Sequence, residues 1–579
     1  MTKNESLFRW IVAGVFAVVC FTFFQLFYEN HLFLKEQMRV FLYTTDYFIS
    51  FWDEPAWLSC YVGNFLSQFY YIKGMGPLIV TLTLLLLWYV SVLVLRKFGG
   101  GNMVAIYAMF PVALELGLMC RLTYNISTTL SFIFVLALFL MYIKIKGKRL
   151  SIILAFVFLP VIYGMVGSRL FIFSLLVIFY EGVKNRKRWW FWLLLLVTSY
   201  LYPYLVRNFY SLTIEDAYKY SYVDGFSVYF PAVLFILEVF VLQTRSVRRI
   251  RLNKQVLVAS VFVLFVTFGT VIWNTNLKRE KVLALDHAVY LEDWDRVIAL
   301  SDHFESPGLL ASYYRNIALA TRNQLPERLL DYNPSGSEVL FLPVDLRSPL
   351  FPLFISNEVY YRIGDMDMAR RQVIQGIIMT PKQRSGRLIK RLAEIDLQKG
   401  DTAEALKYLN ILDATILYHP WAVNQKELLE NGASSGDHYL PRKKDWVNNN
   451  CGYMEAVSDY PDHLSEFVGK YPDNKMALDY LLCAYLLDKK LNAFKEAYEM
   501  YYEGRFTPVP RLYAEALFLQ WYLFSTKEEF EAGYPDSEEM QLAYDKFRHA
   551  KTGDETREEM REQYSSHYWH YFDYGGKCF

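Results

Sequence analysis

The sequence is poor in cysteine and lacks the short motifs that mark many soluble enzymes. Only six of its 579 residues are cysteines. Their spacing shows no pairs, no CxxC and no zinc pattern, so it indicates neither a disulfide framework nor a zinc module. No P-loop, GxGxxG, GxSxG or HExxH motif occurs, which removes the usual signals for nucleotide, hydrolase and zinc-protease chemistry.

Net charge is nearly absent as well. The chain has 60 Lys+Arg and 59 Asp+Glu, a net of +1. This balance, with no basic stripe carrying interleaved aromatics, argues against nucleic acid as a partner. The total hides two dissimilar halves. Residues 1–274 carry 24 Lys+Arg and 12 Asp+Glu, a net of +12, whereas the rest carries 36 and 47, a net of −11. Two different domains therefore contribute to the average.

The first half is rich in long apolar runs. A helix that crosses a bilayer needs roughly 17–25 such residues. We therefore predict an all-α protein whose residues 1–275 form a transmembrane domain in contact with membrane lipid. About nine spans are predicted, at Trp10–Tyr28, Pro77–Leu95, Met103–Met119, Ser127–Ile143, Leu150–Val166, Leu170–Gly182, Trp189–Val206, Val228–Leu242 and Gln255–Trp273.

The positions of the cations predict an orientation. Every second connection between the spans is basic, and with the N-terminus these segments hold 17 Lys+Arg against 7 in the other connections. The positive-inside rule places the basic set in the cytoplasm. An odd number of spans then delivers the tail to the opposite side. We expect a multi-pass plasma (inner) membrane protein with a cytoplasmic N-terminus and an extracytoplasmic tail, periplasmic in a Gram-negative cell.

The tail, residues 276–579, is expected to form helix pairs. Gly364-Asp365 and Gly400-Asp401 each separate two helix-like segments and stand 36 positions apart. Gly suits the end of one helix and Asp the cap of the next. The distance is close to the roughly 34-residue tetratricopeptide period, so a tetratricopeptide-like solenoid is predicted. Residues 283–300 and 477–499 look like weaker copies. A generic array of helical hairpins is the alternative, and residues 568–572 are expected to dock either on the repeats or at the membrane interface.

The longest connection in the first half, residues 29–76, combines aromatic side chains with carboxylates. Asp53 and Glu54 follow an aromatic stretch that begins at Asp46. Trp and Tyr favour the membrane–water interface, where we expect this loop to rest. Neighbouring carboxylates in such a place can provide a catalytic base or a cation site. Alternatively, they cap a short helix that begins near Pro55.

These features resemble the GT-C superfamily of polytopic glycosyltransferases, which includes oligosaccharyltransferases and protein mannosyltransferases. The resemblance lies in Asp53-Glu54 in the first outer loop, in Gly76-Pro77-Leu78 at the start of the second span, and in repeats after the membrane domain. It implies transfer of a sugar or glycan from a polyprenyl-phosphate-linked donor to an extracytoplasmic acceptor, protein or glycan. The layout is also similar to that of uncharacterised bacterial multi-pass membrane proteins, a likeness that implies no function.

Such a transfer assigns a role to each candidate residue. Asp53 and Glu54 would be catalytic, and Asp53 with the intramembrane Glu115 would hold a divalent cation such as Mg²⁺ or Mn²⁺. Arg121, Arg169 and Arg207 lie near outer span ends, where their guanidinium groups would bind the donor phosphate. The alternative roles are anchors at the interface for the arginines, and structural pairing of Glu115 with Arg121. His31 is interpreted as a surface or capping residue.

Two further functions compete with the glycosyltransferase. The first is a non-enzymatic membrane scaffold whose repeat domain recruits envelope proteins, since stacked helix pairs form extended concave surfaces. The second, a transporter, is weaker because the sequence shows no paired broken helices and no inverted repeat.

Overall fold

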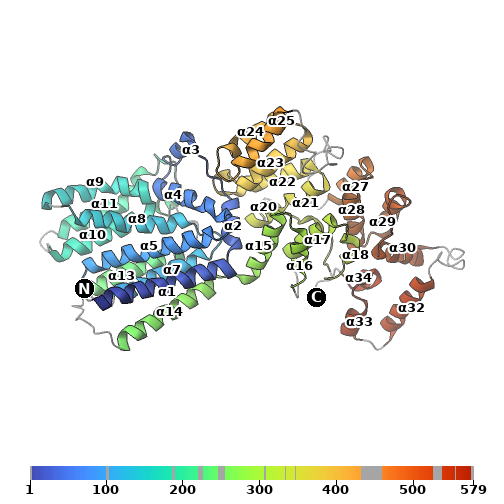
Figure 1. The fold of residues 1–579 in the computed structure, drawn as a ribbon, viewed down its shortest axis with the longest axis horizontal. Helices are drawn as coiled ribbons and strands as arrows, with labels where there is room; N and C mark the ends of the chain where they lie inside the picture. The colour runs from blue at the N-terminus through green and yellow to red at the C-terminus, as the bar shows by residue number, and fades with distance from the viewer. Residues whose placement is uncertain are drawn as a thin grey trace. The chain divides into compact units, whose positions relative to one another are not determined.

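The computed structural model describes residues 3–99, 104–145, 147–184, 189–219, 226–244, 254–304, 308–332, 334–345, 347–431, 460–525, 538–553 and 556–575. All regular elements in these ranges are helices, which confirms the all-α prediction for this part of the chain (Figure 1). The chain divides into two compact units, Met1–Glu280 and Lys281–Phe579.

The first unit contains the most apolar helices. The segment between α1 and α5 forms short helices. Its helices are α1 (Lys3–Phe27), α2 (Asn30–Gln37), α3 (Thr45–Ile49), α4 (Trp57–Ser67), η1 (Gln68–Tyr71), α5 (Met75–Lys97), α6 (Val104–Tyr107), α7 (Met109–Met119), α8 (Ile126–Ile143), α9 (Lys148–Val166), η2 (Gly167–Arg169), α10 (Leu170–Lys184), α11 (Trp189–Val206), α12 (Ile214–Lys219), η4 (Phe226–Tyr229), α13 (Phe230–Thr244), α14 (Lys254–Asn274) and α15 (Leu277–Tyr290), which continues into the second unit.

Fewer of these helices can cross a membrane than the sequence predicts. By length and composition, the described residues provide four candidate spans, or five if one bent pair counts as a single span. The predicted count of nine is therefore not supported. Several apolar runs form helices of only 10–17 residues, and the two runs within 150–182 count as one stretch. The candidates are Trp10–Phe27, Met75–Lys97, Ile126–Ile143 and Leu150–Gly182, with Val261–Asn274 and Leu277–Tyr290 as the bent pair.

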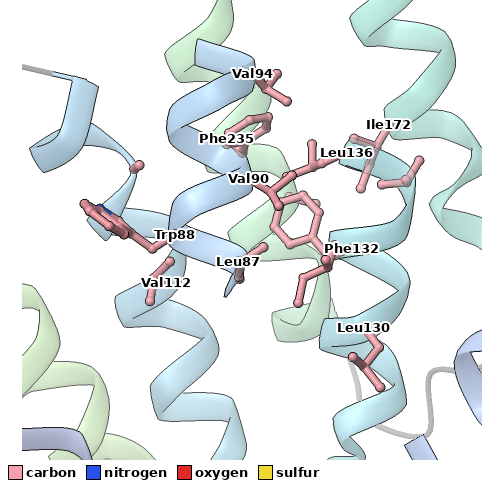
Figure 2. Close-up of a cluster of buried hydrophobic side chains, with 14 of the residues drawn as sticks. Leu87, Trp88, Val90, Val94, Val112, Leu130, Phe132, Leu136, Ile172 and Phe235 are labelled. Carbon is pink, nitrogen blue, oxygen red and sulfur yellow. The ribbon is translucent and has the colours of Figure 1, made fainter. Parts of the chain in front are cut away.

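Helix α5 lies at the centre of the first unit's apolar core. In Figure 2, its Val90 points toward Phe132 of α8, while its Trp88 points the other way, toward Val112 of α7. The indole N–H of Trp88 donates a hydrogen bond to the carbonyl oxygen of Ala105 at 2.9 Å, so the buried ring has a polar partner.

A second face of α5 is exposed and apolar. Leu82, Leu86 and Tyr89 follow the helical period and are exposed, as expected for a helix that is buried on one side and faces lipid on the other. The structure thus supports a membrane protein.

The segment between α1 and α5 is itself folded. Phe41, Tyr47 and Phe51 form a small buried cluster of their own, against which Trp57 and Tyr61 pack. Helix α4 then approaches α8 closely. A Cβ added at Gly63 would lie 2.6 Å from the Cβ of Ser127, a distance that no real pair of side chains adopts. Glycine at position 63 therefore allows α4 to pack directly against α8.

The second unit is a series of short helices. After α15 they are α16 (Trp294–Ser301), α17 (Leu309–Thr321), α18 (Leu325–Arg328), α19 (Glu338–Phe341), α20 (Leu350–Ile355), α21 (Asn357–Ile363), α22 (Met366–Met379), η5 (Pro381–Gln383), α23 (Gly386–Lys399), α24 (Thr402–Asp413), α25 (His419–Glu430), α27 (Tyr460–Lys470), α28 (Lys475–Leu487), α29 (Leu491–Ala497), η8 (Tyr498–Tyr502), α30 (Arg511–Phe524), α32 (Glu538–Thr552), α33 (Arg557–Tyr564) and α34 (Tyr568–Tyr574).

The two Gly-Asp turns have the predicted structure. Gly364 ends α21 with φ 92°, and Gly400 ends α23 with φ 76°, both in the left-handed region. The carboxylates of Asp365 and Asp401 then accept the backbone N–H groups of Met368 and Glu404, which caps α22 and α24. These helix pairs are confirmed, whereas their stacking into a tetratricopeptide solenoid stays a prediction.

The weaker copies use the same turn without glycine. Glu292 and Lys489 take the left-handed conformation instead, with φ of 58° and 59°. Asp293 caps α16 by accepting the N–H of Arg296, but Lys490 precedes α29 with no side-chain cap. Loss of the Gly-Asp pair explains why these copies are hard to detect in the sequence.

The aromatic segment at residues 568–572 docks on α28 of its own unit. The hydroxyl groups of Tyr568 and Tyr571 donate to the carbonyl oxygens of Leu486 and Leu487, at 3.0 and 2.9 Å. Trp569 is buried. The sequence left two docking places open for this segment, the repeats and the membrane interface. The structure shows it on the helices of the second unit.

Candidate functional site

The backbone of the turn at Asp53 and Glu54, which joins α3 to α4, is anchored at both ends. Phe51 before it is fully buried in the aromatic cluster. Ala56 after it is also fully buried, and its N–H donates to the carbonyl oxygen of Tyr163 in α9 at 3.2 Å. Between these anchors Asp53 is exposed and Glu54 is half-buried. The fold of the loop thus fixes the backbone that carries both carboxylates.

The alternative role of this turn, as a helix cap, is wrong for α4. The helix begins at Trp57, and its N-cap residue is Ala56, which has a left-handed backbone and makes no side-chain cap hydrogen bond. The Asp53-Glu54 pair lies two residues and more before that cap. Neither acid is therefore the N-cap residue of α4.

An exposed indole ring directly precedes the two carboxylates in the chain. Trp52 is 55% exposed, and its ring centroid lies 5.6 Å from that of Trp57 and 5.9 Å from that of Phe48. These contacts hold one side of the ring. A pyranose has an apolar face of C–H groups and a rim of hydroxyls. An exposed indole beside carboxylate acceptors suits both parts of such a ring.

Glu115 and Arg169 come together inside the helix bundle. Glu115 of α7 is fully buried, and its Oε1 lies 3.6 Å from Nη2 of Arg169, which is 1% exposed. The other carboxylate oxygen accepts hydrogen bonds from the hydroxyls of Tyr124 and Thr129, at 2.5 and 2.8 Å. The guanidinium of Arg169 also lies over the ring of Phe132, 4.8 Å from its centroid. The structural partner of Glu115 is thus Arg169, where the sequence suggested Arg121.

Arg121 and Arg207 have other surroundings. Half-buried Arg121 donates from Nε to Oδ1 of Asn274 at 2.6 Å and from Nη1 to Oγ of Ser227 at 2.7 Å. It therefore ties the end of α7 to α14 and η4. Arg207, also half-buried, lies over the ring of Tyr204, 4.8 Å from the centroid. This is the geometry of a cation held by an aromatic face at the end of a helix.

A polar cluster around His31 was missed by reasoning from the sequence. His31 is 2% exposed, so its assignment to the surface is wrong. Its Nε2 lies 3.1 Å from the carbonyl oxygen of Met119, which Nζ of Lys35 also reaches at 3.1 Å. Its Nδ1 lies 3.9 Å from Glu280, whose other oxygen accepts the N–H of Asn30 at 2.6 Å. Asn30 and Glu280 are 250 positions apart, so no local pattern announces the cluster.

The residues proposed for a cation do not fit a shared site. Glu115 is enclosed in the bundle with its carboxylate engaged by Arg169, Tyr124 and Thr129, whereas Asp53 is exposed on the loop. Across the described ranges, no group of three or more His, Cys, Asp or Glu side chains is placed to hold a metal ion.

Comparisons with known proteins give one match. The model of a family described as "Family of unknown function (DUF6057)" matches residues 5–575. No curated protein matches the chain. No solved structure matches it either.

Proposed function

The chain belongs to the DUF6057 family, and from its site we propose that it is an integral membrane glycosyltransferase of the GT-C type. It would transfer a sugar or glycan from a polyprenyl-phosphate-linked donor to an extracytoplasmic protein or glycan. The observation that carries the proposal is the anchored turn in which Asp53 and Glu54 directly follow Trp52, whose ring is exposed. Carboxylates can accept hydrogen bonds or a proton from sugar hydroxyls, and an exposed aromatic ring can pack against the apolar face of a sugar.

The reaction assigns a proton acceptor to this turn. A hydroxyl oxygen of the acceptor forms a bond to the anomeric carbon of the donor sugar, and the bond from that carbon to the donor phosphate oxygen breaks. The leaving polyprenyl phosphate keeps the electron pair, and the hydroxyl proton passes to the carboxylate of Asp53 or Glu54. A positioned base contributes roughly 10²–10⁴-fold to such a step.

The three arginines differ in their suitability for the donor phosphate. Arg207 is half-buried and held by an aromatic ring, and Arg121 is half-buried at the end of α7. Both keep the exposure that a lipid phosphate requires. Arg169 is 1% exposed and neighbours Glu115, which favours a structural role. Within this proposal we therefore rank Arg207 and Arg121 before Arg169.

The proposal includes an orientation and a role for the second unit. The loop and the second unit lie outside the cytoplasm, as the distribution of cations predicts. The helix pairs of the second unit, if stacked as a solenoid, hold the acceptor against an extended surface.

Two neutral substitutions test the catalytic role. Asp53→Asn and Glu54→Gln keep the shape of each side chain but remove the basic oxygen, so each is expected to lower transfer by roughly 10²-fold or more. Glycosylation of extracytoplasmic proteins and glycans is measured in cells that carry only the variant gene. Asp46→Asn is the matched control, because Asp46 is an exposed acid on the same loop, and it should retain activity.

The outcomes separate this proposal from the scaffold. If both variants glycosylate normally at wild-type abundance in the membrane, the enzymatic proposal is wrong. A scaffold predicts that pattern, together with a null phenotype when the second unit is deleted.

A further inference from the structure

An exposed apolar strip lies on the C-terminal part of α22. Ile374, Ile378 and Met379 are 44%, 51% and 41% exposed. Ile374 and Ile378 are four positions apart, so their side chains lie on the same face of the helix. The strip leads directly into η5, whose three residues are all exposed and join α22 to α23. Three adjacent large apolar side chains on a surface indicate an interaction site more strongly than scattered ones do.

The surroundings of the strip are basic, although the second half of the chain is acidic. Residues 368–393 contain seven Lys and Arg and no Asp or Glu. Arg387 and Arg391 form ion pairs with Glu358 inside the unit. Arg370 pairs with Asp396, and Lys390 pairs with Glu394. Of the other cations, Lys382 is exposed, and Arg371 and Arg384 are half-buried. The seven cations thus pair with four acids, Asp286, Glu358, Glu394 and Asp396, and the surroundings of the strip stay net positive.

The backbone of η5 presents this charge in a strained conformation. Lys382 and Gln383 both adopt left-handed φ, 55° and 53°. Residues with a side chain rarely do so, and each such position costs roughly 1–3 kcal/mol. Neither residue is glycine, although glycine would remove the strain.

We propose that the α22–η5 surface, formed by Ile374, Ile378, Met379 and Lys382, rests on an anionic lipid surface. Exposed aliphatic side chains flanked by Lys and Arg are the pattern of helices that lie in a membrane interface. Cations near such a surface gain from its negative potential. The chain carries its own candidate spans, so a bilayer is always within reach of the tethered second unit. The inference is independent of the proposed catalytic activity.

Site-specific photocrosslinking of the full chain tests the contact. Ile378→benzoylphenylalanine is made in the full-length protein, which is reconstituted into vesicles of phosphatidylcholine with or without phosphatidylglycerol. After irradiation, lipid adducts on the peptide that contains residue 378 are measured by mass spectrometry. Leu542→benzoylphenylalanine is the control. Leu542 is 59% exposed on α32, a helix whose first turn carries Glu538 and Glu539.

The expected result is a lipid adduct at position 378 that increases with phosphatidylglycerol, and none at position 542. Lys382→Gln, added to the first variant, should reduce the adduct roughly fivefold at low salt, because one interfacial cation is lost. Lys407→Gln, at an exposed lysine of α24, should leave it unchanged. Crosslinks from position 378 to another part of the chain or to a second copy would overturn the proposal. So would absence of any lipid adduct in a reconstituted protein whose transmembrane peptides are protected from protease.

Discussion

Glu358 is an acid enclosed by arginines in the second unit. One of its carboxylate oxygens accepts a hydrogen bond from Nη2 of Arg387 at 2.9 Å, and the other accepts one from Nη2 of Arg391 at 2.8 Å. Burial acts to raise its pKa, but the charges of Arg391, Arg387 and Arg362 outweigh burial and hold the pKa at about 2. Arg387 also contacts both oxygens of Asp286 at 2.9 Å. The network therefore links α15, α21 and α23.

Glu358→Gln is expected to destabilise the second unit by about 3 kcal/mol at neutral pH, since it leaves two buried arginines short of one negative charge. The pKa is lower in the folded state than the ordinary value of 4.5. The wild-type advantage is therefore fully present above pH 4.5 and is lost as pH falls toward about 2. Hydrogen exchange of α21 and α23 at several pH values measures this loss.

Glu496→Gln, at an exposed glutamate of α29, is the control and should change stability by less than about 0.5 kcal/mol. Equal protection of α21 and α23 in both variants at neutral pH would contradict the role assigned to Glu358.

At the scale of residues, the sequence predicts contacts between neighbouring positions but not contacts between positions far apart in the chain. The caps at Asp365 and Asp401 were predicted because cap and helix are neighbours in the sequence. The partners of Glu358 are 29 and 33 positions away, and Arg169 lies 54 positions after Glu115. Only the fold brings such charges together, so the sequence favours the nearer Arg121 as the partner of Glu115, whereas the structure shows Arg169.

At the scale of elements, the Gly-Asp turn gives a specific test. Gly400 has φ 76°, so Gly400→Ala places a Cβ in a left-handed conformation and should cost roughly 1 kcal/mol. Gly400→Asn is the matched control, because Asn enters the left-handed region more readily than Ala and should therefore cost clearly less. Hydrogen exchange of α23 and α24 measures both changes. Equal effects of the two substitutions would contradict the assigned turn.

Helices were easier to predict than their grouping into spans. Each apolar run of the first half is helical in the structure, because its composition leaves few other ways to satisfy the backbone. Length failed as a guide to the number of spans. The run at 103–119 is divided into α6 and α7, and the runs at 189–206 and 228–242 count among the shorter apolar helices of 10–17 residues. The two runs on either side of Gly167, predicted as separate spans, count as one stretch at residues 150–182.

For the whole molecule, the orientation depends on how many helices cross the membrane. Four spans would return the chain to the side of its N-terminus, and five would deliver it to the other side. The clustering of 17 of the 24 Lys+Arg of residues 1–274 in alternate connections favours an extracytoplasmic second unit. We therefore expect a reporter that is active only in the cytoplasm to be inactive when fused after Phe579.

The same reporter fused after Lys97, at the basic end of α5, is the control and should be active. Activity at both positions would place the second unit in the cytoplasm and would remove the proposed meeting of the loop with an outside acceptor.

The packing of the first loop on α8 and α9 has a consequence for the entropy of ligand binding. Glycine 63 lets α4 pack directly on Ser127 of α8, and Ala56 is hydrogen-bonded to Tyr163 of α9, so this part of the loop is anchored on both helices. Ordering a flexible loop around a ligand commonly costs about 1–2 kcal/mol for each residue whose backbone is fixed. Here that cost is met during folding. Under the proposed function, a sugar that reaches Asp53 and Glu54 would meet a backbone that is already ordered, and its binding energy would remain available to lower the barrier of the reaction.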